Sequence, residues 1–322
     1  MREILYLSRK AVEEVGMSFF EVAEAVQEAL RQKYLGRIEM PPKPGIHTAP
    51  DAFIHAMPAF IPELGAAGIK WVGGYPENYK KGLPYITGLL VLNDVETGVP
   101  LSIMDCTWIT AVRTGAATAV AAKYLASDDS KSLAIIGCGV EGRSNLLALN
   151  AFFPSIRDVR AYDISAENAE RYSREMESKG IRVKIASSPR EAIEGADIIV
   201  TAGPILKDPK PTIEASWLSE GCFVCTLDFN SYVTAGAFRS ADRLFTDDLE
   251  QFRYYKGIGY FKETPMPLGD LGDLMAGRIP GRERRNQIIM CVNLGLAIED
   301  MATAIKIYTK AVEKGIGKRL QL

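Results

Sequence analysis

The sequence predicts an α/β protein in which a doubly wound parallel sheet follows a mixed α+β domain. Three observations carry this prediction. The 322 residues allow about two domains of ordinary size. Short apolar runs cut by Pro and Gly fill residues 40–105, and strand-like runs alternate with helical ones beyond a polar spacer at Ser127–Ser130. We therefore expect one domain over residues 1–126, joined by C-terminal helices at about 293–322, and a second over residues 127–292.

The composition is that of a globular protein, with 47% hydrophobic and 24% charged residues. A net charge of −2 leaves no basic excess for a phosphate backbone, so we expect no nucleic-acid partner. No apolar run approaches the roughly 18 residues of a membrane span, so we expect no membrane partner. The five cysteines are an odd number and lie mostly in apolar runs, which predicts free thiols and a cytoplasmic setting. Cys222 and Cys225 form a CxxC without a second pair, so we expect no metal site.

Three segments carry clear helix signals. Ser18 and Glu21 have the spacing of a capping box ahead of apolar residues at helical spacing, which predicts a helix that ends near Gly36. The alanine-rich segment 107–126 predicts a helix that packs closely. A last helix stops at Gly315 and carries an apolar stripe of Ile298, Met301, Ile305, Tyr308 and Val312.

Strand signals fall into an antiparallel and a parallel group. Gly88–Leu92 and Val99–Met104 flank a linker rich in turn formers, and they form the clearest hairpin. In the second domain, apolar runs alternate with helices, which is typical of βαβ units and of a parallel sheet covered on both faces. These runs are, in order, SLAIIG, VRAYD, VKIA, DIIVTAG, GCFVCTLD and RLFTDD.

A glycine-rich loop follows the first of these runs. Residues 133–142 read LAIIGCGVEG, a buried strand that leads into GxGxxG and then a helix. This context is that of a Rossmann-type dinucleotide site. Gly137 permits the tight turn, Gly139 lets the backbone approach a diphosphate, and Gly142 lets the helix pack against the strand.

The second strand of this domain indicates which dinucleotide binds. Asp163 ends that strand 21 residues after Gly142, close to where an acid that binds the adenosine ribose is expected. Its carboxylate accepts from a free 2′-hydroxyl and repels a 2′-phosphate, so we expect NAD. Arg160 and Ser165 lie nearby and keep NADP as the alternative.

Several segments carry a resemblance to a known family. They are MPPKPG (40–45), HAMPAF (55–60), GIKWVGGYPEN (68–78), ITAVRTGAATAVAAKYLA (109–126), IIGCGVEGR (135–143), GADIIVTAGP (195–204) and, near the end, GLAIEDMATA and EKGIG. In this order they resemble the ornithine cyclodeaminase and mu-crystallin family, which includes alanine dehydrogenases and cyclic-ketimine reductases. The resemblance implies a homodimer whose interface is the sheet of the first domain, which would be the substrate-binding and dimerisation domain. It also implies an active site in the cleft beneath the nicotinamide.

The resemblance extends to residues of the substrate site. It implies that Lys70 is the lysine beside the substrate, that Arg113 holds the substrate carboxylate, and that Lys43 is a further cation. Such cations suit a 2-amino or 2-imino acid, because its carboxylate can be clamped, bidentately by Arg113. His55 departs from the family, since we expect an acid there in cyclodeaminases and an arginine in some dehydrogenases. It is either a substrate ligand or proton carrier, or a structural residue.

A second departure concerns proton transfer. A gap-free match puts Asn230 at the family's catalytic aspartate. Asp228, two residues earlier and on the same side of a strand, is the available carboxylate. We predict that Lys70 and Asp228 are catalytic, with Asp228 transferring the proton. Further cofactor contacts are expected from Val140, Glu141, Thr114, Thr201 and Leu227.

The dinucleotide loop and the family resemblance together imply an NAD(P)-dependent oxidoreductase that transfers hydride at the α-carbon of small 2-amino or 2-imino acids. It would be an amino-acid dehydrogenase or a cyclic imine reductase. With His55 at the position of the acid, this reading is favoured over ornithine cyclodeaminase, the NAD-dependent deaminating cyclisation to proline. A non-catalytic, mu-crystallin-like binder of NADP or another ligand is the alternative from a different class. Retention of Lys70, Arg113 and Asp228 favours catalysis.

Overall fold

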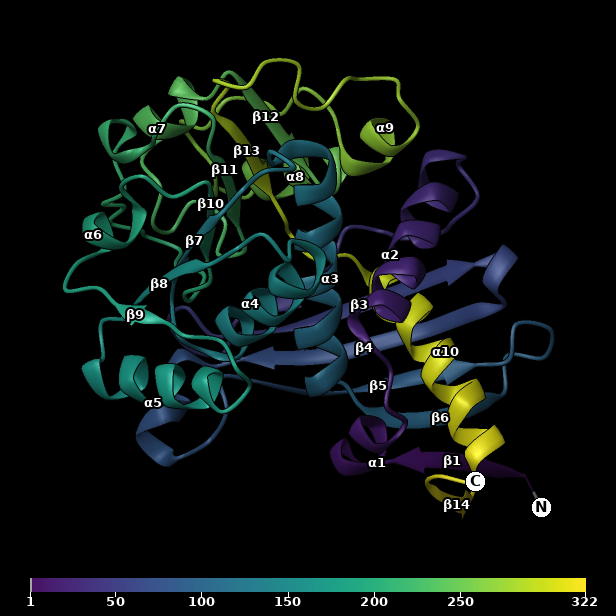
Figure 1. Ribbon diagram of the computed structural model, residues 1–322. Helices are drawn as coiled ribbons and strands as arrows, with labels where there is room; N and C mark the ends of the chain where they lie inside the picture. Colours follow the sequence, from purple (N-terminus) through teal and green to yellow (C-terminus); the bar gives the residue numbers. More distant parts are fainter. Residues whose placement is uncertain (1) are drawn as a thin grey trace. The chain divides into compact units, whose positions relative to one another are not determined.

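The computed structural model describes residues 2–322 and contains two compact units (Figure 1). Unit 1 comprises Met1–Ala116 and Leu296–Leu322, and unit 2 comprises Ala117–Gly295. The helix α3 (Thr107–Leu125) contributes to both units. Our domain boundaries near residues 126 and 292 stay a prediction, which expression of residues 127–292 as a separate fragment would test.

Unit 1 is built on a mixed seven-stranded sheet with the order β14-β1-β6-β5-β4-β3-β2. β1 pairs parallel with β6, and all other neighbouring strands pair antiparallel. The predicted hairpin is confirmed as β5 and β6. The strands are β1 Glu3–Leu7, β2 Gly45–Ile46, β3 Phe53–Ile61, β4 Ala66–Gly74, β5 Ile86–Asn93, β6 Pro100–Asp105 and β14 Lys318–Gln321.

The helices of unit 1 begin with α1 (Arg9–Glu14) and α2 (Phe19–Tyr34). The capping box predicted at the start of α2 is present, with Ser18 as N-cap and Glu21 bonding back to it. Sequence analysis did not anticipate β1 and α1, because elements of five or six residues show too little periodicity. Short 3₁₀ turns follow β3 and β4 at Pro62–Leu64 and Pro76–Lys81.

The last helix, α10 (Ala297–Lys314), packs on α2 and against β3, β4 and β5. It ends at Gly315 in the left-handed conformation, as predicted. The predicted apolar stripe is wrong at its end, because Val312 is 44% exposed. The first turns of α10 are instead buried all round and include two acids, Glu299 and Asp300.

Unit 2 is a doubly wound sheet of seven parallel strands in the order β12-β13-β11-β10-β7-β8-β9. From β7 the chain builds β8 and β9 on one side and then returns to β10 on the other. Ligands of such sheets bind at this switch point, outside the carboxyl ends of the strands. The strands are β7 Ser132–Ile136, β8 Asp158–Tyr162, β9 Lys184–Ile185, β10 Ile198–Thr201, β11 Phe223–Thr226, β12 Arg243–Thr246 and β13 Ile289–Val292.

Six α-helices, besides the end of α3, and one 3₁₀ turn accompany the sheet among the described residues of unit 2. They are α4 Val140–Phe152, α5 Ala166–Glu177, α6 Pro189–Ile193, α7 Ala235–Ser240, α8 Leu249–Gly257, α9 Leu271–Met275 and the 3₁₀ turn Ala215–Trp217. Within residues 2–322, no helix has both the length and the apolar character needed to cross a membrane.

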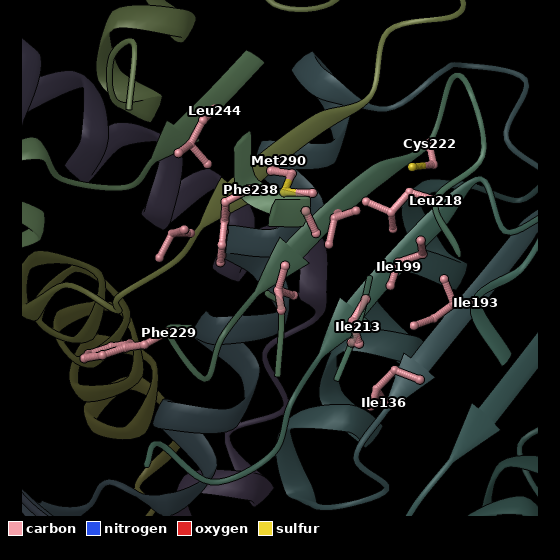
Figure 2. Close-up of a cluster of buried hydrophobic side chains, with 14 of the residues drawn as sticks. Ile136, Ile193, Ile199, Ile213, Leu218, Cys222, Phe229, Phe238, Leu244 and Met290 are labelled. Carbon is pink, nitrogen blue, oxygen red and sulfur yellow. The ribbon is translucent and has the colours of Figure 1, made fainter. Parts of the chain in front are cut away.

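An apolar core fills one face of this sheet (Figure 2). Ile136, Ile199 and Met290 come from three different strands and pack with Phe238 of α7. Cys222 belongs to the same core, where burial raises the pKa of its thiol to about 12. The core holds β7, β10, β11 and β13 in register, and it thereby fixes where the loops at their carboxyl ends begin.

Candidate active site

The glycine loop of unit 2 follows β7 as the sequence predicts. Gly137 has a φ of +105°, and a Cβ atom there would lie 2.7 Å from the Ala202 carbonyl oxygen. A Cβ atom on Gly142 would lie 2.1 Å from the Gly137 carbonyl oxygen, so only glycine lets α4 pack this closely. Gly139 is exposed, with open space where a Cβ would stand. The loop therefore fits a diphosphate at the positive end of α4.

Arg143 supports this loop from the first turns of α4. Its Nη1 donates to the carbonyl oxygens of Cys138 and Gly139, the latter at 3.0 Å, and its Nε bonds Glu175 at 2.5 Å. The guanidinium also lies over the ring of Tyr172, 5.4 Å from the centroid. Sequence analysis missed this residue, because nothing in the GxGxxG pattern shows which side chain holds the loop carbonyls.

Asp163 stands at the end of β8, beside the same loop. Its Oδ2 accepts from the Cys138 N–H at 2.8 Å, and its Oδ1 accepts from the Ser165 N–H at 2.8 Å. Arg160, the nearby cation, is held by Asp158 at 3.3 Å and by two backbone carbonyls. The Asp163 carboxylate is therefore fixed next to the loop. Arg160, the cation that kept NADP as an alternative, is already bound to Asp158 and to backbone carbonyls.

Asp228 lies two residues beyond β11 and is completely buried. Its Oδ1 accepts from Thr201 Oγ1 at 2.7 Å and its Oδ2 from the Gly203 N–H at 2.9 Å. Burial raises the pKa of this carboxyl from 3.8 to about 7, although both hydrogen bonds oppose the shift. Such a pKa suits a group that takes up and releases a proton near neutral pH.

The expectation that Asp228 and Asn230 share one strand face is wrong, because the strand ends at Thr226. Phe229 between them has a φ of +62°, a left-handed conformation that a bulky residue seldom adopts. The turn directs the two side chains to different partners. Asn230 Oδ1 accepts from the Phe261 N–H at 3.3 Å, whereas Asp228 binds the end of β10.

Unit 1 holds four charged side chains in one buried cluster, which we call the charge quartet: Lys70, Arg113, Glu299 and Asp300. Asp300 Oδ2 lies 2.7 Å from Lys70 Nζ, and Asp300 Oδ1 accepts from Arg113 Nε at 3.0 Å. Arg113 Nη1 donates to Glu299 Oε2 at 3.1 Å. All four are at most 6% exposed. The quartet contains two positive and two negative side chains. The Nε and Nη1 groups of Arg113 already bind carboxylates of α10.

Sequence analysis missed Glu299 and Asp300, although it quoted the segment that contains them. A signal was available, since a buried ammonium such as Lys70 needs a partner of opposite charge. The partner could not be named, because Asp300 is 230 residues away in the chain.

His55 and Lys43 are both buried, at 8% and 7% exposure. The His55 ring stacks on Phe53, with centroids 4.1 Å apart. Burial and the nearby positive charges of Lys43 and Lys70 lower the pKa of His55 to about 3, so the ring is neutral at physiological pH. This favours a packed, neutral side chain over the proton carrier.

The remaining predicted cofactor residues are placed as follows. Val140 is 49% exposed and lies with Glu141 in the first turn of α4. The Leu227 N–H bonds the Thr201 carbonyl oxygen at 3.0 Å, and the Thr201 hydroxyl bonds Asp228. Thr114 lies in unit 1 and donates to the Thr110 carbonyl oxygen at 2.6 Å within α3. Within residues 2–322, no group of three or more His, Cys, Asp or Glu side chains is arranged for a metal ion.

The fold and the two sites define a class: a two-unit protein with a Rossmann-type dinucleotide site in one unit and a buried charge quartet in the other. The chain belongs to the ornithine cyclodeaminase/mu-crystallin family, whose sequence model matches residues 2–315.

Individual relatives match along their whole length. A nodulation efficiency protein of Rhizobium meliloti is 35% identical, over 98% of this chain and 97% of the relative. The solved structure of Δ1-pyrroline-2-carboxylate reductase from Thermococcus litoralis, in complex with NADH and L-proline, is 35% identical with a TM-score of 0.88, covering 98% and 99% of the two chains. An archaeal alanine dehydrogenase dimer with bound NAD is 34% identical with a TM-score of 0.87, and the match covers both chains fully.

Proposed function

We propose that this protein is an NAD-dependent oxidoreductase that acts on small 2-amino or 2-imino acids, as an amino-acid dehydrogenase or a cyclic imine reductase. The observation that carries the proposal is the charge quartet, in a chain that also has a dinucleotide loop. Four buried charges are costly, and apolar residues of the same volume would stabilise the fold at least as well. The quartet is best explained by a ligand that carries charges of both signs, such as an amino acid.

We propose NAD as the cofactor. Gly137, Gly139 and Gly142 would hold its diphosphate, and Asp163 would accept from its adenosine ribose. Asp163 would repel the 2′-phosphate of NADP, and Arg160 is engaged by Asp158 and backbone carbonyls. When bound, the dinucleotide supplies the hydride acceptor or donor. The NADH and NAD complexes of the two solved relatives support this choice.

The substrate carboxylate would bind to Arg113 and Lys70, as the family resemblance implies. Lys43 would add a positive charge at the same end of unit 1. These cations would orient the substrate so that its α-carbon is presented in one direction only. Orientation of this kind replaces an encounter in solution by a fixed geometry.

The substrate nitrogen changes its protonation during the reaction, so a proton must be moved. We propose Asp228 for this step, because its pKa of about 7 allows both protonation states at neutral pH. Thr201 and the Gly203 N–H hold its two oxygens and thereby keep the carboxyl in one orientation. Lys70 would hold or activate the substrate, and Asn230 would only orient neighbouring groups.

His55 argues against ornithine as the substrate. The fields of Lys43 and Lys70 that lower the pKa of His55 would also repel a second ammonium group in this region. A neutral histidine offers no compensating negative charge. The dehydrogenase or reductase therefore remains our proposal over the cyclodeaminase.

We also propose a homodimer through the sheet of unit 1. The sheet face that points away from α10 carries exposed apolar side chains, including Trp71 at 48% and its cross-strand neighbour Leu89 at 48%. Tyr6 and Leu320 extend this apolar surface to the far strands β1 and β14. An apolar sheet face is covered in stable proteins, and a second copy of this face would cover it.

A cytoplasmic location is proposed on the cysteines. All five are buried free thiols, which fits a reducing compartment. Cell fractionation would test this.

The function is tested by screening substrates. The protein is incubated with NAD and L-amino acids, and with NADH and cyclic imines, while the absorbance of reduced nicotinamide is followed. We expect turnover of at least one amino or imino acid, and loss of turnover with retained NADH binding in D228N. NADH binding without turnover of any compound would identify a non-catalytic binder instead. Release of ammonia and proline from ornithine would identify a cyclodeaminase.

A further inference from the structure

Asp300 connects the two cations of unit 1. One of its oxygens lies 2.7 Å from Lys70 Nζ, and the other accepts from Arg113 Nε at 3.0 Å. The Asp300 side chain is fully buried, and Lys70 is 1% exposed. Lys70 stands on β4 and Arg113 on α3, so this single carboxylate from α10 fixes the distance between cations of two other elements.

We propose that Asp300 is a positioning residue of the active site: it holds Lys70 and Arg113 at the spacing that the substrate requires, and its charge controls whether Lys70 carries a proton. The role in catalysis rests on the proposed function. The coupling between Asp300 and Lys70 does not, because it follows from the geometry of unit 1 alone.

The charged and titratable groups around Lys70 leave Asp300 as its principal source of negative charge. Burial lowers the pKa of Lys70, and the positive charge of Arg113 on α3 acts in the same direction. Asp300 opposes both. Cys106, just before α3, is a neutral thiol whose pKa burial raises to about 11. His55 on β3 is neutral as well, because its pKa is about 3.

The neighbouring acid, Glu299, provides a matched control. It is also fully buried on α10 and binds Arg113, at 3.1 Å. It also accepts from the Leu296 N–H at 3.3 Å, a bond that a glutamine can keep. Asp300 acts directly on the pKa of Lys70, whereas Glu299 binds Arg113, so removing the charge of Glu299 tests whether any buried acid of α10 has the same effect.

The titration of Lys70 is the first readout. The full-length protein is labelled with ¹³Cε-lysine, and the Lys70 signal is assigned by its absence in K70M. In D300N we expect the midpoint of Lys70 to fall by about one to three pH units relative to wild type. In E299Q we expect a clearly smaller shift. An unmoved Lys70 midpoint in folded D300N would overturn the inference.

Steady-state kinetics on the substrate found in the screen are the second readout. D300N is expected to lower kcat by about a hundredfold, because misplaced groups lose catalytic alignment. D300E keeps the charge but moves the carboxylate by one methylene. Its Lys70 midpoint should stay near that of wild type, while its kcat falls and its NADH affinity is retained. Wild-type kcat in D300E would show that the position of this carboxylate does not matter.

The two variants also separate the sources of failure. If D300N does not fold, the kcat of D300E tests the positioning role. This variant keeps a negative charge that balances Lys70 and Arg113. If the wild-type protein turns over no amino or imino acid, the proposed function fails, and with it the catalytic role of Asp300. The lysine titration still confirms or refutes the coupling in that case.

Discussion

Replacing Asp228 with asparagine should change how the stability of the protein depends on pH. The wild-type carboxyl has a pKa raised from 3.8 to about 7 by burial. The folded protein therefore keeps a proton on Asp228 up to about pH 7, whereas the unfolded chain releases it above about pH 4. Between these values the folded state binds more protons, so the free energy of unfolding falls as pH rises.

The magnitude follows from the shift. Each pKa unit corresponds to about 1.4 kcal/mol, so a rise from 3.8 to about 7 corresponds to a loss of about 4 kcal/mol in the free energy of unfolding across this range. Asparagine does not titrate and removes this loss. Its Oδ1 can accept from the Gly203 N–H while its amide N–H donates to Thr201 Oγ1, so both contacts can be kept.

Urea unfolding of both proteins from pH 4 to pH 8 measures the effect. We expect the free energy of unfolding of D228N, relative to that of wild type, to rise by about 4 kcal/mol from pH 4 to pH 8. N230A is the control, since it alters the same turn without removing a carboxyl, and its pH dependence should follow that of wild type. Parallel curves for D228N and wild type would refute the reasoning, because Asp228 would then titrate alike in both states.

Three further predictions concern the cofactor, the substrate and the dimer. D163A should weaken NAD and relatively favour NADP, as measured by fluorescence titration with the reduced dinucleotides; unchanged NAD affinity would contradict the ribose assignment. R113K should lower kcat/KM by an amount equivalent to about 2–5 kcal/mol, because an ammonium cannot replace the fork between Glu299 and Asp300, and wild-type kinetics would remove Arg113 from the site. W71E should convert the proposed dimer into monomers in sedimentation experiments, since it places a charge on the exposed sheet face; a wild-type monomer would refute the dimer, and a W71E dimer would place the interface elsewhere.

Much of the fold could be predicted because its signals are local. The capping box at Ser18, the hairpin of β5 and β6, and the alternation of strands and helices in unit 2 are all written in short stretches of sequence. The dinucleotide loop belongs to the same group. Its three glycines and the spacing to Asp163 follow from steric limits on a single turn and the strand beside it. The strand β13 was not predicted, since a run of four residues is too short to show a pattern of its own.

The sequence by itself determined the class of fold and the dinucleotide loop, and its resemblance to the family predicted which cations would bind a substrate. The tertiary structure decided what each of these groups faces. It joined Lys70 and Arg113 to acids from the last helix, turned Asp228 away from Asn230 through a left-handed Phe229, and made His55 neutral. The physical reason is that charge state and hydrogen bonding depend on burial and on partners hundreds of residues away, whereas periodicity and spacing report only on neighbours along the chain.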